Sequence, residues 1–86
     1  MAYDLVWHEK VKNDLASLTK EDASRIITRI RTLLVDDPTG LGKPLKGVFK
    51  GLFRYRVGDF RVIFAIDHAE HRVIVLHIKH RKDAYR

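Results

Sequence analysis

The sequence predicts one α+β domain over residues 1–86, in which a strand and two helices precede a meander of three antiparallel strands. Three observations carry this prediction. Apolar residues recur at helical spacing in the first half of the chain. Apolar and polar residues alternate on both sides of Gly58-Asp59. A contiguous apolar run lies near the C-terminus, and this order of elements places the helices on one face of an antiparallel sheet.

The first half of the chain reads as a strand followed by two helices. Residues 3–7 are short and partly apolar, as in a strand, and residues 8–18 carry one apolar stripe at helical spacing. Thr19 is the expected N-cap of a second helix, with Asp22 at the position that completes a capping box. Residues 37–40 end that helix, because the residue before a proline disfavours the α region.

The hairpin predicted over residues 52–64 is the most informative segment. A two-residue turn at Gly58-Asp59 pairs Arg56 with Arg61. Side chains alternate between the faces of a strand, so one face of this hairpin is apolar and the other carries arginines. Like charges that face each other across a sheet destabilise it, and their presence favours a polyanionic ligand. The expected apolar face is Phe53, Tyr55, Val57, Phe60, Val62 and Phe64; the expected arginine face is Arg54, Arg56 and Arg61.

The segments around the hairpin complete the expected fold. Residues 40–51 are rich in glycine and lysine and are expected to form a loop, and residues 67–71 form a polar turn. Residues 72–78 form the last strand, whose contiguous apolar run predicts burial on both faces. The helices should cover the apolar face of the hairpin, which leaves the arginine face open.

Positive charge is concentrated in the second half of the chain. The net charge is +6, but residues 1–42 hold 6 Lys+Arg against 7 Asp+Glu, whereas residues 43–86 hold 11 against 4. Such segregation predicts a polyanion-binding face. The chain has no cysteine, which excludes disulfides and thiolate metal sites. It has no apolar run near the ~20 residues that span a bilayer and no signal-peptide pattern, so we expect a cytoplasmic protein without membrane contact.

The C-terminal segment His80-Arg81-Lys82-Asp83-Ala84-Tyr85 is a second basic cluster. Its imidazole suits proton transfer near neutral pH, and its phenol suits stacking on an unpaired base. The same residues also fit a frayed basic terminus, just as the arginine face fits either a solvated surface or a phosphate clamp. The five histidines show neither an HExxH pattern nor paired cysteines, so no metal and no cofactor is expected.

Three segments taken in order resemble the RelE group of the RelE/ParE toxin superfamily, and the likeness covers almost the whole chain. They are Leu45-Lys46-Gly47, the hairpin at residues 52–64, and the C-terminal segment at residues 80–86. The resemblance implies the toxin of a type II toxin–antitoxin pair and a cognate RelB-like antitoxin. It also implies a metal-independent endoribonuclease that cuts messenger RNA, typically on the ribosome, and leaves 2′,3′-cyclic phosphate and 5′-hydroxyl ends.

The resemblance also assigns site residues. Basic and aromatic positions of the family fall on Arg54, Arg56, Arg61, Arg81 and Tyr85. Some members carry a lysine, assigned as the general base, where two of these arginines stand, and arginine does not readily lose its proton. We therefore expect His80 to act as the base or proton shuttle.

The other expected roles follow from the charges involved. Arg61 would stabilise the phosphorane, Arg81 would assist the leaving oxygen, and Tyr85 would stack on the substrate. Further RNA-binding charge is expected from the lysines Lys46, Lys79 and Lys82.

Three other functions fit the same sequence. A ParE-like toxin would inhibit DNA gyrase without nuclease activity, a plain RNA-binding module would not turn over, and a degenerate toxin would bind only its antitoxin. ParE-type members generally lack the arrangement of His80-Arg81 and Tyr85, so its presence favours the ribonuclease.

Overall fold

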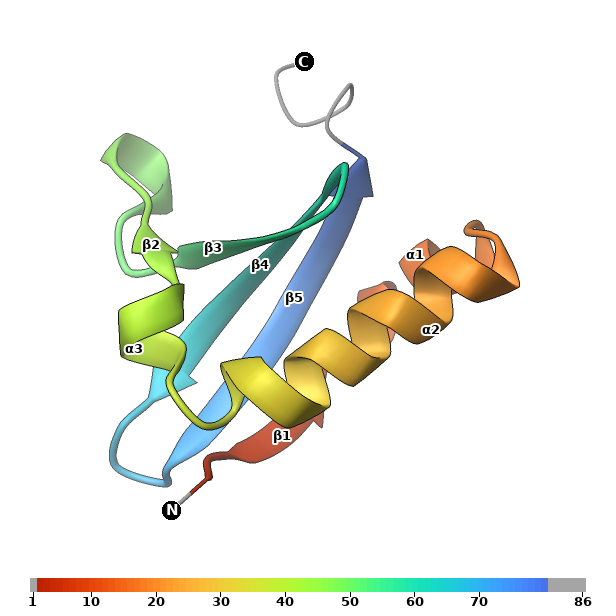
Figure 1. The fold of residues 1–86 in the computed structure, drawn as a ribbon. Coiled ribbons are helices and arrows are strands. Elements are labelled where there is room, and N and C mark those ends of the chain that lie inside the picture. The colour runs from red at the N-terminus through yellow and green to blue at the C-terminus, as the bar shows by residue number, and fades with distance from the viewer. Residues whose placement is uncertain (1, 81–86) are drawn as a thin grey trace.

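The computed structural model describes residues 2–80, which form a five-stranded sheet with α1 and α2 on one side (Figure 1). The helices are α1 (Glu9–Ala16), α2 (Lys20–Arg29), which continues into a π-helical turn (Ile30–Leu34), and α3 (Pro38–Leu41). The strands are β1 (Asp4–Trp7), β2 (Lys43–Pro44), β3 (Phe53–Val57), β4 (Phe60–Asp67) and β5 (Arg72–His80). A 3₁₀ turn (Gly47–Phe49) lies between β2 and β3.

The sheet order is β1-β5-β4-β3-β2. The N-terminal strand β1 runs parallel to β5, and all other pairs are antiparallel. The predicted α+β class and the order of one strand, two helices and three antiparallel strands are confirmed. Within the described residues, no helix is long and apolar enough to cross a membrane.

The hairpin of β3 and β4 has the predicted register. Val57 pairs with Phe60 across Gly58-Asp59, and Arg56 pairs with Arg61. Gly58 has φ +59°, which glycine adopts without strain. The predicted apolar face is buried against the helices, with Phe53 partly buried at its margin. The core cluster consists of Val11, Ile26, Ile30, Leu34, Tyr55, Val57, Phe60, Val62, Phe64, Val73, Val75 and Ile78.

The start of α2 also follows the sequence. Thr19 is the N-cap, and its Oγ1 accepts a hydrogen bond from the backbone N–H of Asp22 at 3.1 Å. The cap satisfies one of the backbone donors that a helix leaves unpaired in its first turn. Ile26, Ile30 and Leu34 then point into the core, with at most 1% of each residue exposed.

Between α2 and β3, the end of the second helix before Pro38 is confirmed, but the expected loop over residues 40–51 was wrong. Residues 37–40 do not simply end the second helix, because Asp37 caps the separate helix α3 through a hydrogen bond from the N–H of Gly40 at 3.1 Å. Residues 40–51 are not only a loop: β2 pairs with β3 and adds a fifth strand. A two-residue strand that contains Pro44 carries no sequence signal, since proline cannot donate to a ladder, and it is tolerated here because β2 is an edge strand.

The last strand is not buried on both faces, contrary to the prediction. The residues facing the helices, Val73 and Val75, are fully buried, whereas Ile74 and Leu76 are only partly buried. Both long helices lie on one side of the sheet, so among residues 2–80 the apolar run of β5 meets a helical layer on that side alone (Figure 1).

A β-bulge at Leu76 divides β5 into two parts. Phe64 of β4 pairs with Val75, but its neighbour Ile63 pairs with His77, so Leu76 is an extra residue in β5. The bulge reverses the alternation of faces along the rest of the strand. Ile78 therefore returns to the core, while His77 lies on the opposite face with Ile63.

Candidate active site

The face of the sheet that α1 and α2 do not cover is called the open face here. Paired residues of neighbouring strands share a face, so the registers of β3, β4 and β5 define two rows of side chains across it. The first row is Arg54, Ile63 and His77, and the second is Arg56, Arg61 and Lys79. Two rows on three adjacent strands thus bring together four cations and one imidazole.

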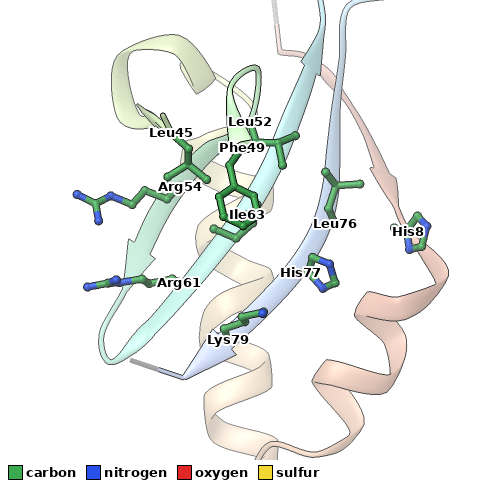
Figure 2. A pocket seen from close by; sticks show the side chains of 10 residues that line it. All are labelled: His8, Leu45, Phe49, Leu52, Arg54, Arg61, Ile63, Leu76, His77 and Lys79. Atoms are coloured by element: carbon green, nitrogen blue, oxygen red, sulfur yellow. The ribbon is translucent and has the colours of Figure 1, made fainter. Parts of the chain in front are cut away.

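A cavity of about 450 Å³ lies over these rows (Figure 2). This volume falls in the range of pockets that hold small ligands. None of the described residues that line it carries a carboxylate. Apolar side chains and basic or imidazole side chains contribute equally to the lining, which consists of Leu45, Phe49, Leu52, Ile63, Leu76, His8, His77, Arg54, Arg61 and Lys79.

The predicted arginines occupy two different positions on the open face. Arg54 and Arg61 extend side by side from β3 and β4 (Figure 2) and line both the main cavity and a neighbouring hollow of about 320 Å³. Arg56 lines only the neighbouring hollow, and its Nε donates to the carbonyl oxygen of Gly58 at 3.0 Å. The structure therefore brings Arg54 and Arg61 together in the main cavity and holds Arg56 at the hairpin turn.

The segment between β2 and β3 forms one wall of the main cavity. The N–H of Leu45 donates to the carbonyl oxygen of Leu52 at 2.9 Å, which closes this segment into a loop beside the sheet. Phe49 lies on the 3₁₀ turn with 58% of its surface exposed while it lines the cavity. Lys46 precedes that turn, is exposed, and does not line the cavity. Of the two predicted RNA-binding lysines that the structure describes, Lys79 lines the cavity and Lys46 does not.

His80 does not lie beside the arginines, contrary to the expectation from the sequence. It pairs with Phe60, whose ring belongs to the core, and the two rings meet edge to face with centroids 5.2 Å apart. The bulge at Leu76 accounts for this position, because it shifts every later residue of β5 to the other face. Arg81, Lys82 and Tyr85 lie outside the described residues.

His77 is a residue of the cavity that the sequence did not reveal. Its Nδ1 lies 3.9 Å from Oδ2 of Asp14, and the same oxygen accepts the backbone N–H of Ile78 at 3.0 Å. Partial burial lowers the pKa of His77, as does the nearby ammonium of Lys10, while the Asp14 carboxylate acts in the opposite direction. No feature of the sequence marks the bulge, so only the structure shows that this histidine faces the arginines.

The site combines an apolar hollow, a group of arginine and lysine side chains, and an imidazole whose lowered pKa favours the neutral form at neutral pH. Guanidinium and ammonium groups bind phosphate oxygens, and a neutral imidazole accepts a proton. Within residues 2–80, no group of three or more His, Cys, Asp or Glu side chains is arranged to hold a metal ion. The arrangement suits a phosphodiester whose base or sugar rests in the apolar hollow.

Comparisons with known proteins agree with this fold. A family model described as the ParE toxin of the type II toxin–antitoxin system, parDE, matches residues 5–85. Toxin RelE of Mycobacterium tuberculosis is 40% identical over 73 residues, which cover 85% of this chain and 75% of that protein. The crystal structure of the toxin–antitoxin complex RelBE2 from the same organism has a TM-score of 0.90 at 26% identity, and the match covers 94% of this chain and 100% of the other.

An archaeal relative shows the same fold. The crystal structure of the RelE–RelB complex from Pyrococcus horikoshii has a TM-score of 0.74 at 28% identity and covers 98% of this chain and 100% of the other. The chain belongs to the RelE/ParE superfamily of type II toxin–antitoxin toxins.

Proposed function

We propose that this toxin is a metal-independent endoribonuclease that cuts messenger RNA on the ribosome and so inhibits translation. The observation that carries the proposal is the open face, where Arg54, Arg61 and Lys79 border one cavity without any carboxylate among its described lining residues. A polyanionic substrate is the chemistry that such a surface fits. The 40% identity to Toxin RelE favours this function over gyrase inhibition.

The reaction needs negative charge to be stabilised at phosphorus. As the 2′-oxygen attacks, charge builds on the non-bridging phosphate oxygens, and fixed cations lower the free energy of that transition state. We assign this role to Arg61, with Arg54 beside it. Guanidinium groups suit the task because they stay protonated and bind two oxygens at once. Arg81 and Tyr85 keep the roles that the family resemblance implies, assistance to the leaving oxygen and stacking on the substrate.

The partner we infer is a RelB-like antitoxin, in cells where both proteins share the cytoplasm with the ribosome. Solved relatives from Mycobacterium tuberculosis and Pyrococcus horikoshii are complexes of a toxin with its antitoxin. An acidic antitoxin segment that folds on binding would complement the basic open face.

The test is RNA cleavage by the purified full chain, freed of any partner, with and without ribosomes programmed with a defined messenger RNA. EDTA is present throughout, and product ends are analysed chemically. We expect ribosome-dependent cuts with 2′,3′-cyclic phosphate and 5′-hydroxyl ends. A 2′-deoxy substitution at the mapped cut position should abolish the cut, because it removes the nucleophile.

A pair of charge-matched double variants controls for net charge. Arg54→Ala/Arg61→Ala removes two cations from the open face and should abolish cutting. Arg25→Ala/Arg29→Ala removes two exposed cations from α2 and should leave cutting intact. If the wild-type chain makes no cut under either condition, the ribonuclease proposal is refuted, and a DNA supercoiling assay would test the gyrase-directed function.

A further inference from the structure

We infer that His77 is the catalytic residue that takes the proton from the attacking 2′-hydroxyl, and that Asp14 is its positioning residue. This inference rests on the proposed ribonuclease function and names the base that the function requires. It derives from the bulge in β5, the cavity on the open face and the contact between α1 and the edge of β5.

The rows of the open face place His77 beside the phosphate-binding cations. Arg61 pairs with Lys79, and His77 precedes Lys79 by two residues on the same face. Residues two apart on one strand are separated by about 7 Å. A phosphate held between Arg61 and Lys79 therefore lies one row from the imidazole, and the ribose of the same nucleotide spans the gap.

Asp14 fixes the histidine from the edge of the sheet. The strand β1 covers the edge of β5 only as far as Val75, whose carbonyl oxygen accepts the N–H of His8 at 2.9 Å. Beyond that point α1 covers the edge of β5, and the Asp14 carboxylate of this helix accepts the N–H of Ile78. The same carboxylate oxygen lies 3.9 Å from Nδ1 of His77, so one side chain both closes the strand edge and faces the ring.

The position of the carboxylate decides which nitrogen is free. At 3.9 Å the contact is longer than a hydrogen bond and acts through space. Negative charge beside Nδ1 favours the tautomer that carries its proton on Nδ1. Nε2 then has the free lone pair and is the atom that accepts the 2′ proton.

The charged and titratable groups around His77 come from α1, from its N-cap and from β5. Lys10 and Asp14 approach from α1, His8 caps the start of that helix, and Lys79 follows on β5. Burial and the cations lower the pKa of the imidazole, so the ring is a base in its neutral form near pH 7. The remaining basic groups of the cavity are arginine and lysine side chains, which carry hydrogen-bond donors and no acceptor.

The step balances without a further reagent. Nε2 of His77 takes the proton of the 2′-hydroxyl, the 2′-oxygen forms a bond to phosphorus, and the bond from phosphorus to the 5′-oxygen breaks. The 5′-oxygen takes a proton from solvent and leaves as an alcohol, and the imidazolium returns its proton to solvent. The products are a 2′,3′-cyclic phosphate and a 5′-hydroxyl.

The first experiment compares two histidine variants in single-turnover cleavage of ribosome-bound messenger RNA between pH 5 and pH 9. His77→Gln should slow cleavage about 10²- to 10⁴-fold, the usual contribution of a general base. It should also remove the acidic limb of the pH–rate profile, which is the fall in cleavage rate as the base becomes protonated at low pH. His80→Gln is the matched control, because its ring lies on the other face of the same strand. It should keep the wild-type rate and pH profile.

The second experiment changes the charges beside the ring without touching it. Asp14→Asn keeps an oxygen that accepts the N–H of Ile78 but removes the negative charge, so the acidic limb of the pH–rate profile should move to lower pH. Lys10→Gln removes a positive charge and should move that limb to higher pH. If Asp14 acted only as the acceptor for the N–H of Ile78, the acidic limb of Asp14→Asn would stay at its wild-type position.

Each outcome separates the inference from the function on which it rests. If wild-type protein cuts but His77→Gln keeps its rate and profile, the inference is refuted and the ribonuclease function stands. The inference is likewise refuted if His80→Gln alone loses activity, or if the acidic limb stays fixed in both Asp14→Asn and Lys10→Gln. A wild-type chain that never cuts refutes both.

Discussion

The two faces of the sheet differ although the same strands build both. Toward α1 and α2, β3, β4 and β5 present apolar side chains that are almost fully buried. On the open face, neighbouring residues of these strands present arginines, a lysine and a histidine around an apolar hollow. Side-chain alternation, which the bulge at Leu76 resets in β5, separates the two groups, so residues adjacent in sequence have unrelated tasks.

This separation assigns stability to one face and chemistry to the other. The helix-covered face supplies the burial that holds an 86-residue domain together, where the margin of stability is small. The open face groups like charges whose mutual repulsion works against folding. A substitution on the covered face should therefore lower the unfolding free energy, whereas a substitution at a neighbouring position on the open face should lower activity.

The largest effect is expected on the covered face. Phe64 is fully buried, so Phe64→Ala should lower the free energy of unfolding by about 3–5 kcal/mol, measured by urea denaturation. Its neighbour Ile63 points to the open face and is partly buried, and Ile63→Ala should cost clearly less. Equal losses at both positions would break the comparison between the faces.

The next effect is expected on the open face and in activity. Arg61→Ala should reduce RNA cleavage about 10²- to 10³-fold, because it removes a cation from the transition state. Its free energy of unfolding should fall far less than that of Phe64→Ala, because Arg61 is only partly buried whereas Phe64 is fully buried. Arg56→Ala is the matched control, since Arg56 pairs with Arg61 but does not line the main cavity. A loss as large in Arg56→Ala would place the reacting phosphate at the hairpin turn instead.

A smaller effect is expected at the start of α2. Thr19→Ala removes the side-chain acceptor for the N–H of Asp22 and should cost about 1 kcal/mol of unfolding free energy. Thr19→Ser keeps the acceptor and should recover most of that loss. Since the cap is remote from the open face, cleavage by folded Thr19→Ala should be unchanged, and a loss of activity below its unfolding transition would contradict the division between the faces.

The smallest effect concerns pH and stability. The pKa of His77 is lower in the folded chain than its ordinary value of about 6.5, chiefly because of burial. As pH falls below about 6.5, the unfolded chain takes up this proton before the folded chain does, so stability decreases. The midpoint temperature of thermal unfolding should therefore fall more steeply for wild type than for His77→Gln as the pH is lowered from 7 to 5. A steeper decline in the variant would mean that folding raises the pKa of this histidine.

Local patterns accounted for the hairpin and the helices. The Gly-Asp turn set the register of β3 and β4, and this register is enough to place Arg54 and Arg61 on one face. Thr19 marked the start of α2 for the same reason, since a cap depends on residues within one turn. The charge asymmetry of the chain likewise indicated a basic surface. The arginines and the lysine that line the cavity all come from the basic second half of the chain.

The sequence by itself thus determined the fold class, through the periodicity of its helices and strands, and the register and arginines of the hairpin, which depend on contacts between residues close in the chain. The tertiary structure decided what depends on distant partners: the pairing of β2 with β3, the closure of the β5 edge by Asp14 and the bulge at Leu76. Simple alternation from Val75 would have put His80 on the open face. One extra residue, fixed by pairing with β4, exchanged it for His77.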